Sequence, residues 1–289
     1  MRILGENIGC VERKTSPILF ITILTTFLLL FLYHNDVWRP IRYWLFLNGL
    51  ILFAIPLISL VFLDKKRGLP LRFFSGTVIV IMLLLLIKFT TVRQLLTTLN
   101  IPVTRQFFLL MKKPQVVYPL SALFSLIAVI ILVLGKVDIR SYGITLGKVK
   151  FWVPILLVFF LCMIPLIFWA SRLPSFQKTY PMLPLAKEGI RGFIIAELSF
   201  GLFFIFWEFF FRGYMLFALE KRTGFLVANS FQAMAFAFMH IGKPELEVYS
   251  ALVGGLIVGW LCWRSKSFLP AFFIHWANQT MMDLFAVIK

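Results

Sequence analysis

The chain has 289 residues, of which 61% are hydrophobic and 14% are charged, and its formal net charge is +17. A soluble domain is usually about 45–50% apolar and about 25% charged, so the composition excludes an ordinary soluble enzyme, a disordered protein and a disulfide scaffold. Because the 29 Lys and Arg residues form no dominant basic block, we expect a membrane protein with basic loops and no nucleic-acid partner.

Nine apolar stretches are candidates for transmembrane helices, which need about 20 residues to cross the bilayer. These stretches are residues 17–33, 41–63, 73–87, 118–134, 151–170, 192–219, 225–240, 248–263 and 268–288. The third and the seventh are short. We therefore predict an all-α, polytopic integral membrane protein with eight or nine transmembrane helices in a lipid bilayer.

A proline-containing segment, residues 173–185, marks a boundary in the predicted architecture. The apolar stretches before it hold few polar residues, whereas the stretches after it hold nearly all of them. We therefore divide the chain into residues 1–187, which form N-terminal transmembrane helices without a recognised signature, and residues 188–289, a helical core that carries the candidate functional residues.

The stretch 192–219 contains three ionisable residues, Glu197, Glu208 and Arg212. Placing an ionisable side chain near the centre of a membrane costs about 2.5–3.5 kcal/mol of free energy. We therefore look for a structural or functional role for each of the three. Glu208 and Arg212 are spaced i,i+4 and therefore share one helix face. The pair is explained either by a buried ion pair that lowers its own burial cost or by a functional carboxylate that Arg212 restrains.

Two of the three histidines also lie in apolar stretches. His240 ends the stretch 225–240, and His275 lies in the last stretch, one turn before Asn278 and Gln279 on the same helix face. Carboxylate, imidazole and amide groups together are suited to moving protons. Between the two histidines, Gly255 and Gly259 form a G-x-x-x-G pair, which predicts close helix packing.

The segments WEFFFR (207–212), FAFMH (236–240) and HWANQ (275–279) occur in this order on three different apolar stretches. They resemble the three motifs of the CAAX protease and bacteriocin-processing (CPBP, or Abi) family of intramembrane proteases. Those motifs are two glutamates, three residues and an arginine; F-x-x-x-H; and a histidine with an asparagine four residues on. The resemblance covers about a third of the chain, roughly residues 188–287.

The resemblance implies a membrane endopeptidase that hydrolyses a peptide bond of a membrane-anchored protein or peptide. The family includes the type II endopeptidases that remove the last three residues of prenylated proteins. Its bacterial members are linked to bacteriocin processing, self-immunity and surface-protein sorting, so we expect a bacterial inner (cytoplasmic) membrane location.

The resemblance also implies roles for individual residues. Glu208 and His240 would activate the attacking water, and His275 would stabilise the oxyanion with Gln279 or Asn278. The family has been described both as metal-dependent and as glutamate-dependent without metal. The sequence has no H-E-x-x-H zinc motif, so we expect no cofactor, and a divalent metal stays an open alternative.

The chain departs from the family pattern at the first and last motifs. Trp207 stands where the family has the first glutamate, which is usually given the role of base. Gln279 takes the asparagine position and still has an amide that donates hydrogen bonds. Either Glu208 is then the base, or another helix supplies the acid through Glu247 or Asp283. The alternative is a catalytically altered pseudoprotease that binds or sequesters membrane peptides.

Overall fold

The computed structural model describes residues 20, 23–24, 27–28, 138–240 and 243–288. Every regular element in this part of the chain is helical, as predicted for an all-α protein. The four apolar stretches predicted between residues 17 and 134 lie almost entirely outside the described residues. The total of eight or nine transmembrane helices therefore stays a prediction.

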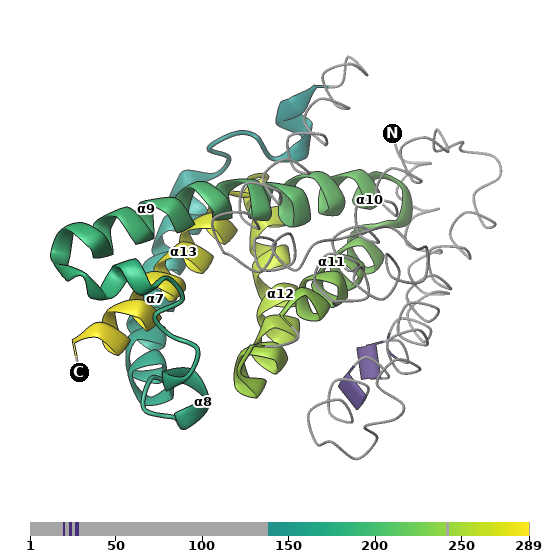
Figure 1. The fold of residues 1–289 in the computed structure, drawn as a ribbon. Helices are drawn as coiled ribbons and strands as arrows, with labels where there is room; N and C mark the ends of the chain where they lie inside the picture. The colour runs from purple at the N-terminus through teal and green to yellow at the C-terminus, as the bar shows by residue number, and fades with distance from the viewer. Residues whose placement is uncertain (1–19, 21–22, 25–26, 29–137, 241–242, 289) are drawn as a thin grey trace, which may run out of the picture.

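The described part of the chain is a series of helices that pack against one another at different angles (Figure 1). Their order is η2 (Ile139–Tyr142), α7 (Val149–Ala170), α8 (Pro174–Gln177), η3 (Pro184–Lys187), α9 (Gly189–Glu208), η4 (Phe209–Met215), α10 (Leu216–Thr223), α11 (Phe225–Met239), α12 (Glu245–Ser265) and α13 (Leu269–Val287).

Three helical segments of the described residues are long and apolar enough to cross a membrane. They are α7, the continuous helix Gly189–Lys221 and α12. These segments match the predicted stretches 151–170, 192–219 and 248–263. Helix α11 is apolar but shorter, and α13 covers nearly the whole of the last predicted stretch. These apolar helices support the expectation of an integral membrane protein.

Local sequence explains where several helices begin and end. Pro174 and Pro184 occupy the first turns of α8 and η3, where the missing backbone N–H is not needed. Gly224 separates α10 from α11 and has φ of 81°, a conformation that residues with a side chain rarely adopt. The chain reverses at this glycine, so α10 and α11 pack against each other.

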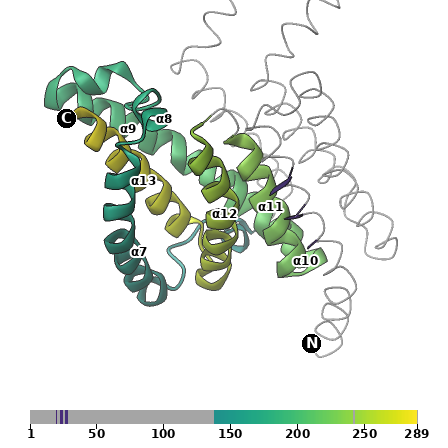
Figure 2. The same ribbon diagram turned by 90° about the horizontal axis from the view of Figure 1, so that it is seen from below.

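Helix α11 lies between α10 and α12, while α13 packs against α9 and α7 (Figures 1 and 2). The predicted glycine pair faces α11. A Cβ atom on Gly255 would lie 3.1 Å from the Cβ of Ala233, and one on Gly259 would overlap the side chain of Asn229. The glycines therefore allow α11 and α12 to approach closely, which fixes the helix that ends at His240.

Helix α7 shares the buried core of the C-terminal helices. Trp152 and Leu156 belong to the same cluster of buried hydrophobic residues as Phe204 of α9 and Ile274 of α13. The predicted division between residues 187 and 188 itself stays a prediction.

Candidate active site

The first motif lies where α9 changes into a π-helix. Glu208 is the last residue of α9, and Arg212 lies within η4, whose seven residues are π-helical. Such segments are rare and are frequently found at functional sites, because the extra residue in each turn changes the directions of the side chains. Glu208 and Arg212 are 1% and 2% exposed, so the turn holds both charges inside the protein.

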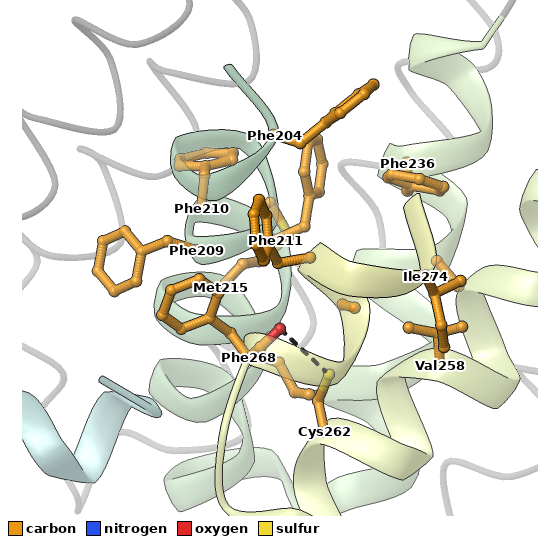
Figure 3. Packing of buried hydrophobic residues seen from close by; sticks show 14 of the residues in the cluster. Phe204, Phe209, Phe210, Phe211, Met215, Phe236, Val258, Cys262, Phe268 and Ile274 are labelled. Atoms are coloured by element: carbon orange, nitrogen blue, oxygen red, sulfur yellow. Dashed lines mark hydrogen bonds between the residues drawn. The ribbon is translucent and has the colours of Figure 1, made fainter. Parts of the chain in front are cut away.

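Aromatic side chains hold this π-helical turn in place (Figure 3). The ring of Phe209 lies 5.7 Å from that of Phe268, and the ring of Phe211 lies 5.5 Å from that of Phe236. Gly213 is required inside the turn, because a Cβ atom there would lie 2.6 Å from the ring of Phe209. The turn is therefore anchored to the segment before α13 and to α11.

Both carboxylate oxygens of Glu208 are engaged. Its Oε2 lies 2.8 Å from Nη1 of Arg212, so the predicted i,i+4 pair is present. Its Oε1 lies 2.5 Å from Nδ1 of His275, which comes from α13. The side chain of His275 is 20% exposed and thus lies at the edge of the buried pair. Glu208 therefore connects the first motif to the last.

Phe236, the first residue of the second motif, contacts Arg212, His240 and His275. The guanidinium of Arg212 lies 3.6 Å from the centre of its ring, which is a cation–π contact. The same ring lies 4.4 Å from the ring of His240 and 5.4 Å from that of His275. Its position four residues before His240 was the only signal in the sequence for this role.

His240 completes the cluster from the end of α11. The side chain is buried, and its ring lies 5.8 Å from the ring of His275 with 28° between the two planes. Phe204 of α9 also belongs to the site, because its ring stacks on that of His275 at 4.0 Å; the sequence motifs did not predict this residue. The three predicted catalytic residues, Glu208, His240 and His275, are thus brought together.

The hydrogen bonds define which nitrogen of each imidazole carries a proton. Nδ1 of His240 lies 2.8 Å from the carbonyl oxygen of Phe236, and Nδ1 of His275 faces the carboxylate of Glu208. A carbonyl and a carboxylate only accept hydrogen bonds, so both Nδ1 atoms must donate. In the neutral form of each ring, Nε2 is then the nitrogen that accepts a proton.

The predicted amides lie one turn beyond His275 on α13. Gln279 is buried and interacts with the carboxyl group of Asp283. Asn278 is half-buried, and its Oδ1 atom is buried without a hydrogen-bond donor among the described residues.

The two acids predicted as alternatives to Glu208, namely Glu247 and Asp283, form hydrogen bonds with the segment that follows α8. Tyr180 donates a hydrogen bond of 2.7 Å to Glu247, which also lies 3.4 Å from the ammonium of Lys243. Asp283 accepts a hydrogen bond of 3.1 Å from the backbone N–H of Met182. The partners of Glu247 and Asp283 in these contacts are thus residues other than Glu208, His240 and His275.

Trp207 belongs to a row of aromatic rings along the helix. Its ring lies 5.2 Å from that of Phe203 and 5.1 Å from that of Phe211. Its Nε1 atom is buried and has no hydrogen-bond partner in the described part of the chain. An indole has no group that accepts a proton near neutral pH, so Trp207 cannot take the role of a glutamate.

The described residues do not provide a metal site. No group of three or more His, Cys, Asp and Glu side chains in this part of the chain is arranged to hold a metal ion. Glu208 is already occupied by Arg212 and His275, which leaves it poorly suited as a ligand. We therefore derive no chemical step through a metal.

Comparison with known protein families identifies the same region. Residues 190–281 match the family model described as type II CAAX prenyl endopeptidase Rce1-like. No curated protein and no solved structure matches the chain. The matched segment extends from α9 into α13 and contains all three motifs. The resemblance predicted from those motifs is thus confirmed: residues 190–281 of this integral membrane protein are similar to the CAAX-type intramembrane proteases of the CPBP family.

Proposed function

We propose that the chain is an intramembrane endopeptidase that hydrolyses a peptide bond of a membrane-anchored protein or peptide. The family match at residues 190–281 supports this class of reaction. The observation that carries the proposal is the contact of 2.5 Å between Glu208 and His275, beside the ring of His240. It joins one motif to another across two helices that are distant in sequence.

In the proposed mechanism, His275 is the general base and Glu208 orients it. The carboxylate accepts a hydrogen bond from Nδ1–H, so Nε2 of His275 takes a proton from the attacking water and then gives it to the leaving amine. Glu208 stabilises the imidazolium that exists between these two steps. Hydrolytic triads use a carboxylate behind a histidine in the same way. Arg212 holds the other oxygen of Glu208 and keeps the carboxylate from turning away.

His240 and the amides of α13 would then stabilise the oxyanion. When its Nε2 is protonated, His240 donates to the developing negative charge beside His275, and Asn278 or Gln279 would add a second donor. The motif resemblance alone assigns the roles in the opposite way, with Glu208 and His240 on the water and His275 on the oxyanion. The contact between Glu208 and His275 favours the exchange of the two histidine roles.

One observation favours a pseudoprotease as the second candidate. Trp207 replaces the first glutamate of the motif, and both oxygens of the remaining Glu208 are already engaged by protein groups. A chain without a competent base would still bind membrane peptides and would not release shortened products.

The experiment uses the purified full-length protein in lipid bilayers with a set of membrane-anchored peptides. Wild type is compared with His275→Ala, Glu208→Gln and His240→Ala, and Glu188→Gln serves as the control because Glu188 is exposed before α9. We expect His240→Ala to lower kcat by about 10²–10³-fold and Glu208→Gln by up to about 10⁴-fold.

The same experiment separates the two candidates. Cleavage that all three site variants leave unchanged would contradict the mechanism. Peptide binding without cleavage in the wild-type protein would establish the pseudoprotease. Mass spectrometry of membrane-protein termini, with and without this gene, would then identify substrates of an active enzyme.

A further inference from the structure

Helices α9 and α13 make a second polar contact away from Glu208 and His275. Glu197 lies three turns before Glu208 on α9 and is 6% exposed, and Asp283 on α13 is 0% exposed. Thr280 donates a hydrogen bond of 2.6 Å to Oε2 of Glu197. About 16 Å of helix separates Glu197 from Glu208, so Glu197 does not take part in the chemistry directly.

Glu197 and Asp283 each have one carboxyl oxygen outside the hydrogen bonds described above. Oε1 of Glu197 and Oδ2 of Asp283 are buried and accept no hydrogen bond of ordinary geometry from the described residues, although the amide of Gln279 lies beside the carboxyl group of Asp283. Glu197 is hydrogen-bonded to Thr280, and Asp283 lies three residues beyond Thr280 on the same face of α13, so the two carboxyl groups lie beside each other. Two ionised carboxylates in contact would repel, whereas a carboxylic acid donates its proton to a carboxylate. One proton between these two oxygens therefore satisfies both groups.

The neighbouring contacts indicate which group carries that proton. Asp283 accepts from the backbone N–H of Met182 through Oδ1, and the ammonium of Lys243 lies 2.8 Å from the sulfur of the same methionine. Both favour an ionised Asp283. Glu197 then has its Oε2 bonded to Thr280 and its Oε1–H directed at Oδ2 of Asp283.

The same surface fixes the register of α9 on α13. Trp276, the residue after His275, donates a hydrogen bond of 2.8 Å from its indole N–H to the backbone carbonyl oxygen of Glu197. Gly201 makes room for that indole, because a Cβ atom there would lie 2.8 Å from its ring. A shift of one helix along the other would break these contacts together with the contact between His275 and Glu208.

We propose that Glu197 and Asp283 share one proton and act as positioning residues, fixing α13 on α9 so that His275 meets Glu208. The effect on catalysis rests on the proposed function, whereas the shared proton and the register do not. Loss of the shared contact releases His275 from its place while leaving every group of the cleavage site intact.

The shared proton is tested by infrared spectroscopy of the full-length protein in bilayers at neutral pH. We expect wild type to show the carbonyl stretch of a protonated carboxylic acid, and the double variant Glu197→Gln, Asp283→Asn to lack it. Glu188→Gln should retain the band, since that side chain is exposed. A wild-type spectrum without a band that the double variant loses would overturn the shared proton.

The positioning role is tested with a conservative and a disruptive variant. In Glu197→Gln the amide still donates to Asp283, whereas Glu197→Leu removes the donor from α9 and leaves Asp283 with its bond from Met182. The chain has only three histidines, so ¹⁵N-histidine labelling resolves them, and His275→Ala assigns the signal. We expect the hydrogen-bonded Nδ1–H signal of His275 in wild type and in Glu197→Gln, and its loss in Glu197→Leu.

Kinetics provide the second readout if the protein cleaves peptides. Displacement of a catalytic group by about 1 Å lowers the rate by about 10²-fold, so Glu197→Leu should lower kcat by about 10–100-fold while KM stays within about twofold. Glu197→Gln should remain close to wild type. Equal values for the two variants, or an unchanged His275 signal in Glu197→Leu, would overturn the positioning role. An inactive wild type would contradict only the proposed function.

Discussion

At the scale of single residues, Glu208 has two partners that serve different purposes. Arg212 is its neighbour on the same helix and balances its charge in an apolar environment, and His275 is the group that the carboxylate orients in the proposed mechanism. Phe236 holds this arrangement from a third side through its contacts with Arg212 and both imidazoles. The site is therefore built from charges that neutralise one another and rings that exclude water.

Replacing Phe236 tests this support. In Phe236→Leu an apolar side chain remains at this position, but the guanidinium of Arg212 loses the ring at 3.6 Å. We expect the free energy of unfolding to fall by about 2 kcal/mol, as for a desolvated cation–π contact. Thermal unfolding in detergent measures the change. Phe272→Leu is the control, because Phe272 is buried like Phe236 and its ring contacts Phe273 and Trp276 without a cation; an equal loss in both variants would contradict the role of Arg212.

Trp207 is the second test at this scale. Its indole packs between Phe203 and Phe211, and its Nε1 makes no hydrogen bond within the described residues. Trp207→Phe keeps an aromatic ring in this row and loses no hydrogen bond, so it should keep cleavage within about threefold of wild type. Peptide cleavage by the purified variant measures this. Trp207→Glu restores the family residue. Cleavage gained by this variant from an inactive wild type would favour the pseudoprotease.

At the scale of helices, close packing of α12 on α11 determines where His240 lies. A Cβ atom on Gly259 would overlap Asn229 and Gln232, whereas one on Gly254 would meet nothing within 4 Å. Gly259→Ala should therefore lower the free energy of unfolding by about 1–3 kcal/mol. Gly254→Ala should raise it by up to about 1 kcal/mol, because alanine favours the helix. Thermal unfolding of the matched pair measures both, and equal shifts would contradict close packing at Gly259.

The helices also show what a sequence can predict here. The spacing of Glu208 and Arg212 predicts their ion pair, because four residues make one helical turn. Hydropathy predicts α7 and α12 to within three residues at each end, because a bilayer requires long apolar segments. The contact between Glu208 and His275 joins residues 67 apart and depends on how α9 packs on α13, which no local pattern encodes. The π-helical turn after Glu208 was likewise not predicted, since its aromatic sequence is equally compatible with an α-helix.

At the scale of the whole molecule, the apolar composition is visible as an apolar surface. Helix α7 exposes side chains that a soluble protein would bury, among them Leu157 at 61% and Leu161 at 72%. Cys162 lies on the same helix and is also exposed. In an integral membrane protein this exposure is to lipid, so the surface of α7 should be inaccessible to reagents dissolved in water.

The natural thiol of Cys162 makes this measurable. A thiol reacts with maleimide as the thiolate, which forms only where water reaches it. In a Cys10→Ser variant reconstituted in bilayers, we expect Cys162 to react at least about tenfold more slowly than a cysteine placed on α8 by Ser175→Cys. Cys262 is buried and should stay unreactive in both proteins, so it does not obscure the comparison. Mass spectrometry of labelled peptides measures the rates, with labelling in denaturant as the complete reaction. Equal rates at Cys162 and at residue 175 would mean that water covers α7, and the membrane placement of this helix would be wrong.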